Sequence, residues 1–195
     1  MNNDLLNKVK EKIGNKEGAH GLDHFLRVRS IALKIAEKEN ADKEIVEAMT
    51  LLHDLVRFED EREEESVEET LREAKNILLE LNFSQDKIQL ILGGIESHSL
   101  HSKTQKDPST LEAKILFDAD KIDSVGEIGL ARWFMTMGNK NISIKDSALI
   151  YLNTIKKQEE KMNFKLYTKT GTKLIKKDLE FSKNFLISLV EKLNN

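Results

Sequence analysis

Two histidines and two aspartates interrupt apolar segments of this sequence. His53 and Asp54 lie within the hexapeptide 51–56, LLHDLV, whose other four residues are apolar. His24 begins an apolar stripe at helical spacing, and Asp120 follows the apolar pair at 116 and 117. Burying an imidazole or a carboxylate costs on the order of several kcal/mol unless it is paired, neutralised or bound to a cation. These four side chains therefore need a compensating partner.

A divalent cation is one such partner, because the four side chains form a mixed nitrogen and oxygen donor set. Imidazole and carboxylate ligands suit Mn²⁺, Fe²⁺, Ni²⁺ or Zn²⁺ better than an all-oxygen Ca²⁺ site. The alternative is a purely structural role, since a single buried histidine is more often a hydrogen-bonded core residue than a metal ligand. We expect His24, His53, Asp54 and Asp120 to bind one divalent metal ion.

The elements that must position these residues are predicted to be helices. The sequence has a single proline, Pro108, and lacks the alternation of apolar and polar residues that is typical of strands. We therefore expect an all-α fold, a compact helical bundle. The predicted helices lie at 22–39, from the N-cap Asp42 to about 58, from after 65 to about 81, at 84–98, at 109–137, at 144–162 and at 173–193.

Three of these boundaries depend on particular residues. Ser109 and Glu112 have the spacing of a capping box at the start of a long helix through about Met137. Segment 167–172 is expected to join the last two helices, and the polar segment 98–108 to form a loop. Two pairs of glycines either permit close helix contacts or mark irregularities in helices: Gly93 with Gly94, and Gly126 with Gly129.

The two ligand residues 53 and 54 are adjacent, and consecutive helical side chains diverge by about 100°. They can approach one point only at the edge of their helix, and the other ligands must come from neighbouring helices. No internal repeat or low-complexity linker divides the chain, so we expect a single domain over residues 1–195. Helices at about 144–193 show apolar stripes but no chemistry, and three roles stay open for them: completing the bundle, capping the pocket or forming a homodimer contact.

Composition excludes several classes of protein. The chain has 31 Lys and Arg against 34 Asp and Glu, a net charge of −3, which argues against a dedicated nucleic-acid-binding protein. It has no cysteine, which excludes thiol catalysis and thiolate zinc sites and agrees with a reducing compartment. No signal peptide or membrane span is predicted. We expect a cytoplasmic protein with neither nucleic acid nor membrane as a partner.

The order His24, His53–Asp54, Asp120 resembles the H…HD…D signature of the HD superfamily of metal-dependent phosphohydrolases. Segment 20–28, HGLDHFLRV, and segment 112–132, EAKILFDADKIDSVGEIGLAR, are similar to the corresponding segments of its small stand-alone hydrolases. The resemblance covers residues from about 18 to 137. It implies the same four metal ligands, with Asp118 outside the ligand set. Lys121 departs from the arginine that is frequent at its position but keeps a cation there.

The resemblance also implies a function. Members of the superfamily cleave nucleoside monophosphates, deoxynucleoside triphosphates, cyclic dinucleotides and alarmones, and a few are oxygenases; the small subgroup is associated with nucleotide hydrolysis, including pyrophosphate release. We expect a phosphohydrolase that acts on a nucleotide or related phosphate ester through attack of metal-bound water on phosphorus. The ion would be Mn²⁺, Fe²⁺, Ni²⁺, Zn²⁺ or Mg²⁺. The alternative is a catalytically silent nucleotide-sensing or regulatory domain, but the intact ligand set favours the enzyme.

Four residues are predicted to act on the substrate. Asp54 would orient or deprotonate the attacking water. Arg27 and Lys121 would bring fixed cations to the phosphate, although Arg27 is as easily interpreted as a surface ion-pair partner. His98 would protonate the leaving group or contact phosphate. A second metal ion bound by His98 and His101 is the less favoured arrangement, and the acidic run 59–65 is either a solvated loop or the mouth of the site.

Overall fold

The computed structural model describes residues 3–14, 21–56, 63–98, 107–160 and 166–194, and within these ranges it contains helices and turns but no strand. The all-α prediction is therefore confirmed. The helices are α1 (Asn3–Ile13), α2 (Leu22–Glu39), α3 (Lys43–Leu52), α4 (Glu63–Glu80), α5 (Gln85–His98), α6 (Leu111–Asp123), α7 (Gly126–Asn139), α8 (Ile144–Glu160) and α9 (Lys169–Asn194). None of these helices combines the length and the apolar character that crossing a membrane requires.

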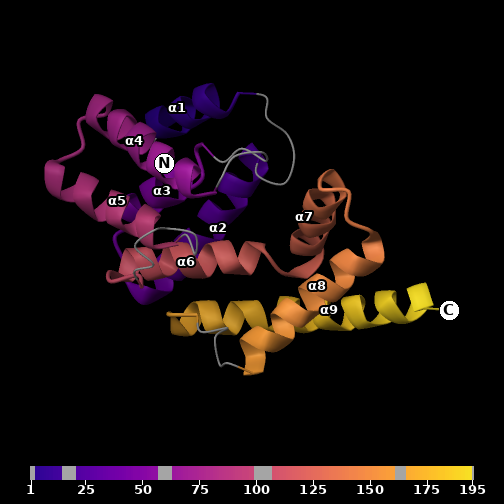
Figure 1. The fold of residues 1–195 in the computed structure, drawn as a ribbon. Helices are drawn as coiled ribbons and strands as arrows, with labels where there is room; N and C mark the ends of the chain where they lie inside the picture. Colours follow the sequence, from indigo (N-terminus) through magenta and orange to yellow (C-terminus); the bar gives the residue numbers. More distant parts are fainter. Residues whose placement is uncertain (1–2, 15–20, 57–62, 99–106, 161–165, 195) are drawn as a thin grey trace.

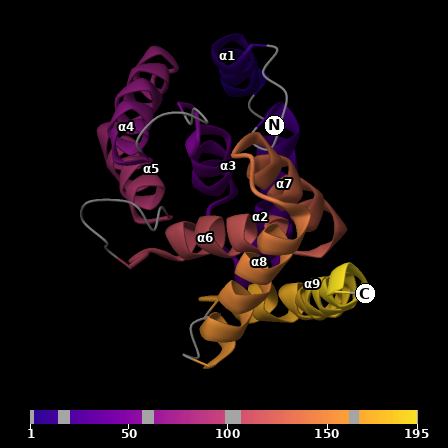
Figure 2. The ribbon, with the colours of Figure 1, turned by 45° about the vertical axis from the view of Figure 1, so that its right-hand side comes forward.

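Two apolar cores organise these helices. The larger core joins α1 to α6, with α2 packed against both α3 and α6. The smaller core lies among α7, α8 and α9 (Figure 1). Helix α9 also packs along α6, so it connects the two cores (Figure 2). No helix is predicted over residues 3–13, yet Leu5, Val9 and Ile13 of α1 are buried in the larger core.

Helix α3 begins as predicted but ends earlier. The side chain of Asp42 accepts hydrogen bonds from the backbone N–H groups of Glu44 and Ile45, which confirms the predicted N-cap. The helix ends at Leu52 rather than near residue 58, and 53–56 form turns. The carbonyl of Thr50, which a continuing helix would bond to residue 54, lies 2.8 Å from the His53 ring instead. This early end brings His53 and Asp54 into a turn.

The predicted capping box at the start of α6 is wrong by one residue. Thr110 is the N-cap, and its hydroxyl accepts from the N–H of Ala113 at 3.1 Å. Glu112 does not reach back to its own helix, because its carboxylate accepts the backbone N–H of Asp42 at 3.1 Å. A contact with a distant segment has taken the place of the local one.

The single helix predicted over 109–137 is two helices in the structure. Helix α6 ends at Asp123, and α7 starts at Gly126, where φ is +74°. A left-handed conformation of this kind favours glycine, and the hydroxyl of Ser182 on α9 accepts the N–H of Gly126 at 2.8 Å. Gly126 therefore marks an irregularity, which is one of the two roles considered for it.

Helix α9 begins at Lys169, four residues before its predicted start, because the two residues that precede it are held on α6. The carboxylate of Asp118 is fully buried and accepts the N–H groups of Tyr167 and Thr168, each at 2.8 Å, and the hydroxyl of Thr168 at 2.6 Å. The hydroxyl of Thr168 in turn accepts the N–H of Gly171. Most of the predicted connection at 167–172 is thus the first turn of the helix.

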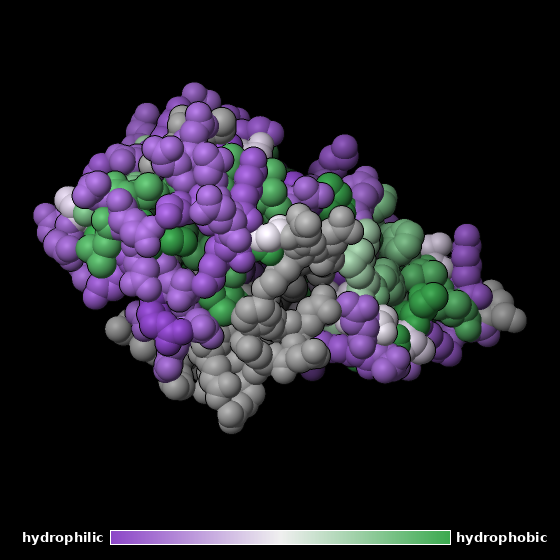
Figure 3. Space-filling model, turned by 90° about the horizontal axis from the view of Figure 1, so that it is seen from above, coloured by the Kyte–Doolittle hydropathy of each residue, from purple (hydrophilic) through white to green (hydrophobic). Residues whose placement is uncertain are grey.

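The outer surface is uneven in polarity. In the space-filling view, apolar side chains gather at the right-hand end, over α7 and the C-terminal part of α9 (Figure 3). Exposed apolar residues of these two helices include Ile128, Met135, Phe185 and Leu193. A face of this kind suits a contact with another protein surface, and the homodimer stays a prediction.

The junction between α6 and α7 leads to a prediction for Gly129. A Cβ atom there would lie 2.2 Å from the carbonyl carbon of Ser124, so backbone would have to move. We expect Gly129→Ala to lower the free energy of unfolding by about 2 kcal/mol or more, measured by urea denaturation with circular dichroism. Gly93→Ala is the matched control, because a Cβ at Gly93 meets nothing within 4 Å and alanine is the better helix former. Equal stability of the two variants would contradict the tight junction.

Candidate metal centre

The centre of the site is a pair of buried imidazoles. His24 lies in the first turns of α2, and His53 lies in the turn after α3. Their Nε2 atoms are 3.2 Å apart, and the two residues are only 1% and 2% exposed. The apolar stripe of α2 and the early end of α3 thus bring together two side chains that are 29 residues apart in sequence.

Two carboxylates surround this pair. Asp54 Oδ2 lies 3.9 Å from His24 Nε2 and 3.8 Å from His53 Nε2. Asp120 Oδ1, from α6, lies 3.7 Å from His24 Nε2. The four side chains predicted to share an ion are therefore gathered in one cluster. Donor atoms of His24, His53 and Asp120 all lie within 4.8 Å of one another, as do those of His53, Asp54 and His98.

The outer nitrogens of the histidines show why this donor set fits a metal ion. Nδ1 of His24 faces a carboxylate oxygen of Asp123 at 2.8 Å, and Nδ1 of His53 faces the carbonyl oxygen of Thr50 at 2.8 Å. Carboxylate and carbonyl oxygens only accept, so in each neutral ring Nδ1 is the donor and Nε2 carries a lone pair. Two lone pairs facing each other at 3.2 Å repel unless a positive charge lies between them. These His and Asp residues could therefore hold a divalent metal ion.

Electrostatics keep the donors in ligand form. Burial lowers the pKa of His53 to about 4, so the ring is neutral near pH 7. Burial opposes ionisation of Asp120, but the positive charge of Lys121 beside it favours the ionised form, and the pKa of that carboxyl lies well below its ordinary value. Neutral imidazole and ionised carboxylate are the forms that bind divalent ions.

Asp123 is a residue of this site to which the sequence analysis gives no role. Its carboxylate accepts from His24, from Arg27 at 2.8 and 3.2 Å, and from Arg132. Burial by itself would raise the pKa of Asp123. The hydrogen bonds from His24 and Arg27 and the charge of Arg132 outweigh burial, so the pKa lies below its ordinary value. The available signal was its position three residues after Asp120, on the same side of a helix.

The residues predicted to contact substrate lie around this cluster. His98, at the end of α5, has Nε2 at 3.7 Å from Asp54 Oδ1. Lys121 Nζ is 3.7 Å from Asp120 Oδ2 and 5.4 Å from the centre of the Phe117 ring. Arg27 is engaged through Nε and Nη2 by Asp123, so the structure gives it an ion pair, and its phosphate contact stays a prediction.

Two predicted features fall partly or wholly beyond the described ranges. His101, considered for a second metal ion, lies outside them, as does His20 of the motif at 20–28. Residues 59–62 of the acidic run are also outside, so its place at the mouth of the site stays a prediction. Asp118 lies in α6 with its carboxylate on the first turn of α9, away from the ligand set that was predicted.

The chain is similar in sequence and in fold to a protein of Bacillus subtilis. The chain is 31% identical over 134 residues to the protein YpgQ of Bacillus subtilis, a match that covers 68% of this chain and 64% of the length of YpgQ. The crystal structure of YpgQ in complex with ADP is 25% identical and covers 97% of this chain and 93% of that one, with a TM-score of 0.74.

A second solved structure comes from an uncultured Thermotogales bacterium and is described as a predicted HD superfamily hydrolase. It is 25% identical, covers 98% of this chain and 92% of that one, and has a TM-score of 0.68. The model of the HD domain family matches residues 21–125, a range that includes His24, His53, Asp54 and Asp120. This match extends over more than half of the sequence and confirms the resemblance seen in the motifs: the chain belongs to the HD domain family.

Proposed function

We propose that the chain is a metal-dependent phosphohydrolase that acts on a nucleotide, with His24, His53, Asp54 and Asp120 as ligands of one divalent ion. The observation that supports this most strongly is the pair of buried Nε2 atoms 3.2 Å apart with two carboxylates around it. When bound, a divalent ion activates water and neutralises charge on a phosphoryl oxygen. The likeness to YpgQ, which was crystallised with ADP, supports a nucleotide as substrate.

Asp54 is proposed to orient the attacking water. Its Oδ2 faces His24 and His53, and its Oδ1 faces His98 at 3.7 Å. One oxygen can thus serve as a ligand while the other accepts a hydrogen bond from the water, which fixes the direction of attack. The proton released in the attack would be taken up at Oδ1.

His98 is proposed to give a proton to the leaving oxygen. Its Nδ1 bonds to the carbonyl of Ile95, which leaves Nε2 directed at Asp54. Burial lowers the pKa of His98, but the negative charge of the nearby Asp54 carboxylate outweighs this, and the pKa lies above the ordinary 6.5. A protonated Nε2 beside the reacting phosphate is the arrangement that general acid catalysis needs.

Two cations are proposed to bind the phosphate. Lys121 lies beside Asp120, and its ammonium group can attract phosphoryl oxygens that approach the cluster. Arg27 holds Asp123 through Nε and Nη2, so we expect any contact with substrate to come from Nη1.

Removal of one imidazole tests the metal centre. We expect His53→Gln to weaken Mn²⁺ binding by about 100-fold or more, because one of the two facing Nε2 ligands is lost. The measurement is isothermal titration calorimetry on metal-free protein. Asp86→Asn, at an exposed position of α5, is the control and should bind Mn²⁺ with the affinity of the wild type. Unchanged affinity in His53→Gln would show that the ion, if bound, lies elsewhere.

A nucleotide panel tests the reaction. We expect the Mn²⁺-loaded protein to release phosphate or pyrophosphate from at least one nucleoside mono-, di- or triphosphate, and Asp54→Asn to lose this release because the water is no longer held. Products are separated by ion-exchange chromatography, and Asp86→Asn again serves as control. Binding of a nucleotide without turnover under any divalent ion would favour the sensing alternative. Release that persists undiminished in Asp54→Asn would reveal a contaminating activity.

The role of His98 has its own test. We expect His98→Gln to lower kcat for the nucleotide by about 100-fold or more, with little change in KM, because the leaving oxygen loses its proton donor. A p-nitrophenyl phosphate ester needs little protonation of its leaving group, so its kcat should fall much less. An equal fall for both substrates would mean that His98 supports the ligands instead of protonating the leaving group.

A further inference from the structure

We propose that Asp123 is a positioning residue that fixes the ring of His24 in its Nδ1–H form and so keeps Nε2 available as a ligand. The use of Nε2 as a ligand rests on the proposed metal-dependent function. The contacts that support the role of Asp123 are nonetheless internal to the chain and are present without any ion.

The first contact is the one between Asp123 and His24. Asp123 Oδ2 lies 2.8 Å from His24 Nδ1, and the two side chains are 3% and 1% exposed. An ionised carboxylate can only accept, so the proton must sit on Nδ1. A neutral ring has one N–H group, and Nε2, 3.2 Å from His53 Nε2, is then left with its lone pair toward the cluster.

Without Asp123 the ring has a reason to adopt the other form. His53 Nε2 carries a lone pair because its own Nδ1 donates to the carbonyl of Thr50. At 3.2 Å, His53 Nε2 would accept a hydrogen bond from an N–H group at His24 Nε2. That hydrogen bond would close the pair and occupy both of the nitrogens that are proposed as ligands. The contact with Asp123 is therefore what opposes it.

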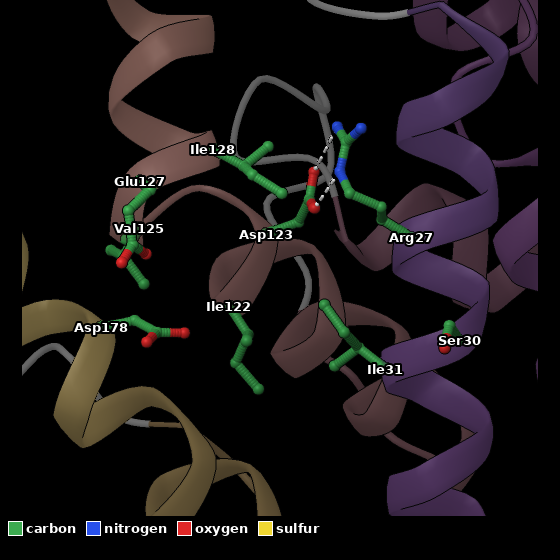
Figure 4. A pocket seen from close by; sticks show the side chains of 10 residues that line it. Arg27, Ser30, Ile31, Ile122, Asp123, Val125, Glu127, Ile128 and Asp178 are labelled. Atoms are coloured by element: carbon green, nitrogen blue, oxygen red, sulfur yellow. Dashed lines mark hydrogen bonds and ion pairs between the residues drawn. The ribbon is translucent and has the colours of Figure 1, made fainter.

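Two arginines hold Asp123 in place. Arg27 on α2 donates through Nε to Oδ1 at 2.8 Å and through Nη2 to Oδ2 at 3.2 Å, as the dashed lines in Figure 4 show. Arg132 on α7 donates through Nη1 to Oδ2 and to the backbone oxygen of Asp123. Two guanidinium groups from different helices favour the ionised carboxylate and fix its direction. A carboxylate that accepts the outer N–H of a metal-binding histidine is a general way of orienting the ring.

A cavity of about 240 Å³ lies beside this arrangement (Figure 4). Arg27 and Asp123 line it, whereas His24, His53, Asp54 and Asp120 do not. Asp123 therefore both lines the cavity and contacts His24. Asp178 of α9 lines the same cavity. Within the described part of the chain, no hydrogen bond or ion pair joins Asp178 to either histidine, so it offers a matched control, a carboxylate in the same cavity that is not bonded to the ring.

The test measures the position of the proton directly. Long-range ¹⁵N–¹H spectra of the metal-free protein distinguish a protonated from an unprotonated ring nitrogen, and His24→Gln identifies the signals of His24. We expect Nδ1–H in the wild type and in Asp178→Ala, and a shift toward Nε2–H in Asp123→Ala. Mn²⁺ affinity of Asp123→Ala should fall by about 10- to 100-fold, with Asp178→Ala unchanged.

Asp123→Asn keeps an acceptor oxygen but loses the charge, so it should retain more of the Nδ1–H form and more Mn²⁺ affinity than Asp123→Ala, and less affinity than the wild type. A wild-type His24 with its proton on Nε2, or a ring unchanged in Asp123→Ala, would overturn the proposal. Should Asp123→Ala not fold, wild-type affinity in Asp123→Asn would overturn it instead. A wild type that carries Nδ1–H but binds no Mn²⁺ would refute the proposed function and leave the role of Asp123 standing.

Discussion

Two imidazole nitrogens with lone pairs face each other at 3.2 Å in the interior of this protein, and the structure around them maintains that approach. Each ring is fixed from behind by an oxygen that can only accept, the carboxylate of Asp123 for His24 and the carbonyl of Thr50 for His53. With the nearby carboxylates of Asp54 and Asp120, this arrangement could hold a divalent cation, which would relieve the repulsion between the two lone pairs.

Helix α6 connects this cluster to the rest of the molecule through three aspartates. Asp120 faces the histidines, and Asp123 joins His24 to Arg27 and Arg132. Asp118 points to a different side and holds Thr168, the residue just before α9. One short helix thus links the candidate metal centre, the α2 and α7 arginines and the C-terminal helix. Helices that contribute no ligand still contribute to the geometry, because α7 supplies Arg132 and α9 supplies the hydroxyl that binds Gly126.

The balance of charge in the cluster also depends on these outer contacts. Arg27 and Arg132 offset the buried Asp123, and Lys121 lies beside Asp120. Burial alone would favour protonated carboxyls, but these cations favour the ionised forms. A site prepared in this way holds ionised carboxylates and a neutral His53 before any ion or substrate arrives.

The sequence by itself determined the all-α class, the family and the four residues gathered in the cluster, because each of these depends on residue type or local periodicity. His24 could be placed inside from the stripe of α2, and His53–Asp54 from the apolar hexapeptide around them. The tertiary structure alone decided where α3 ends, that the helix predicted over 109–137 breaks at 124–125, and that Asp118 holds α9. It also decided that Asp123 pairs with a histidine 99 residues away. For the start of α7, the start of α9 and Asp123 the physical reason is the same: a partner distant in sequence makes the hydrogen bond, and only packing brings it within reach. At the end of α3 the competing contact is local, from the His53 ring to the carbonyl of Thr50.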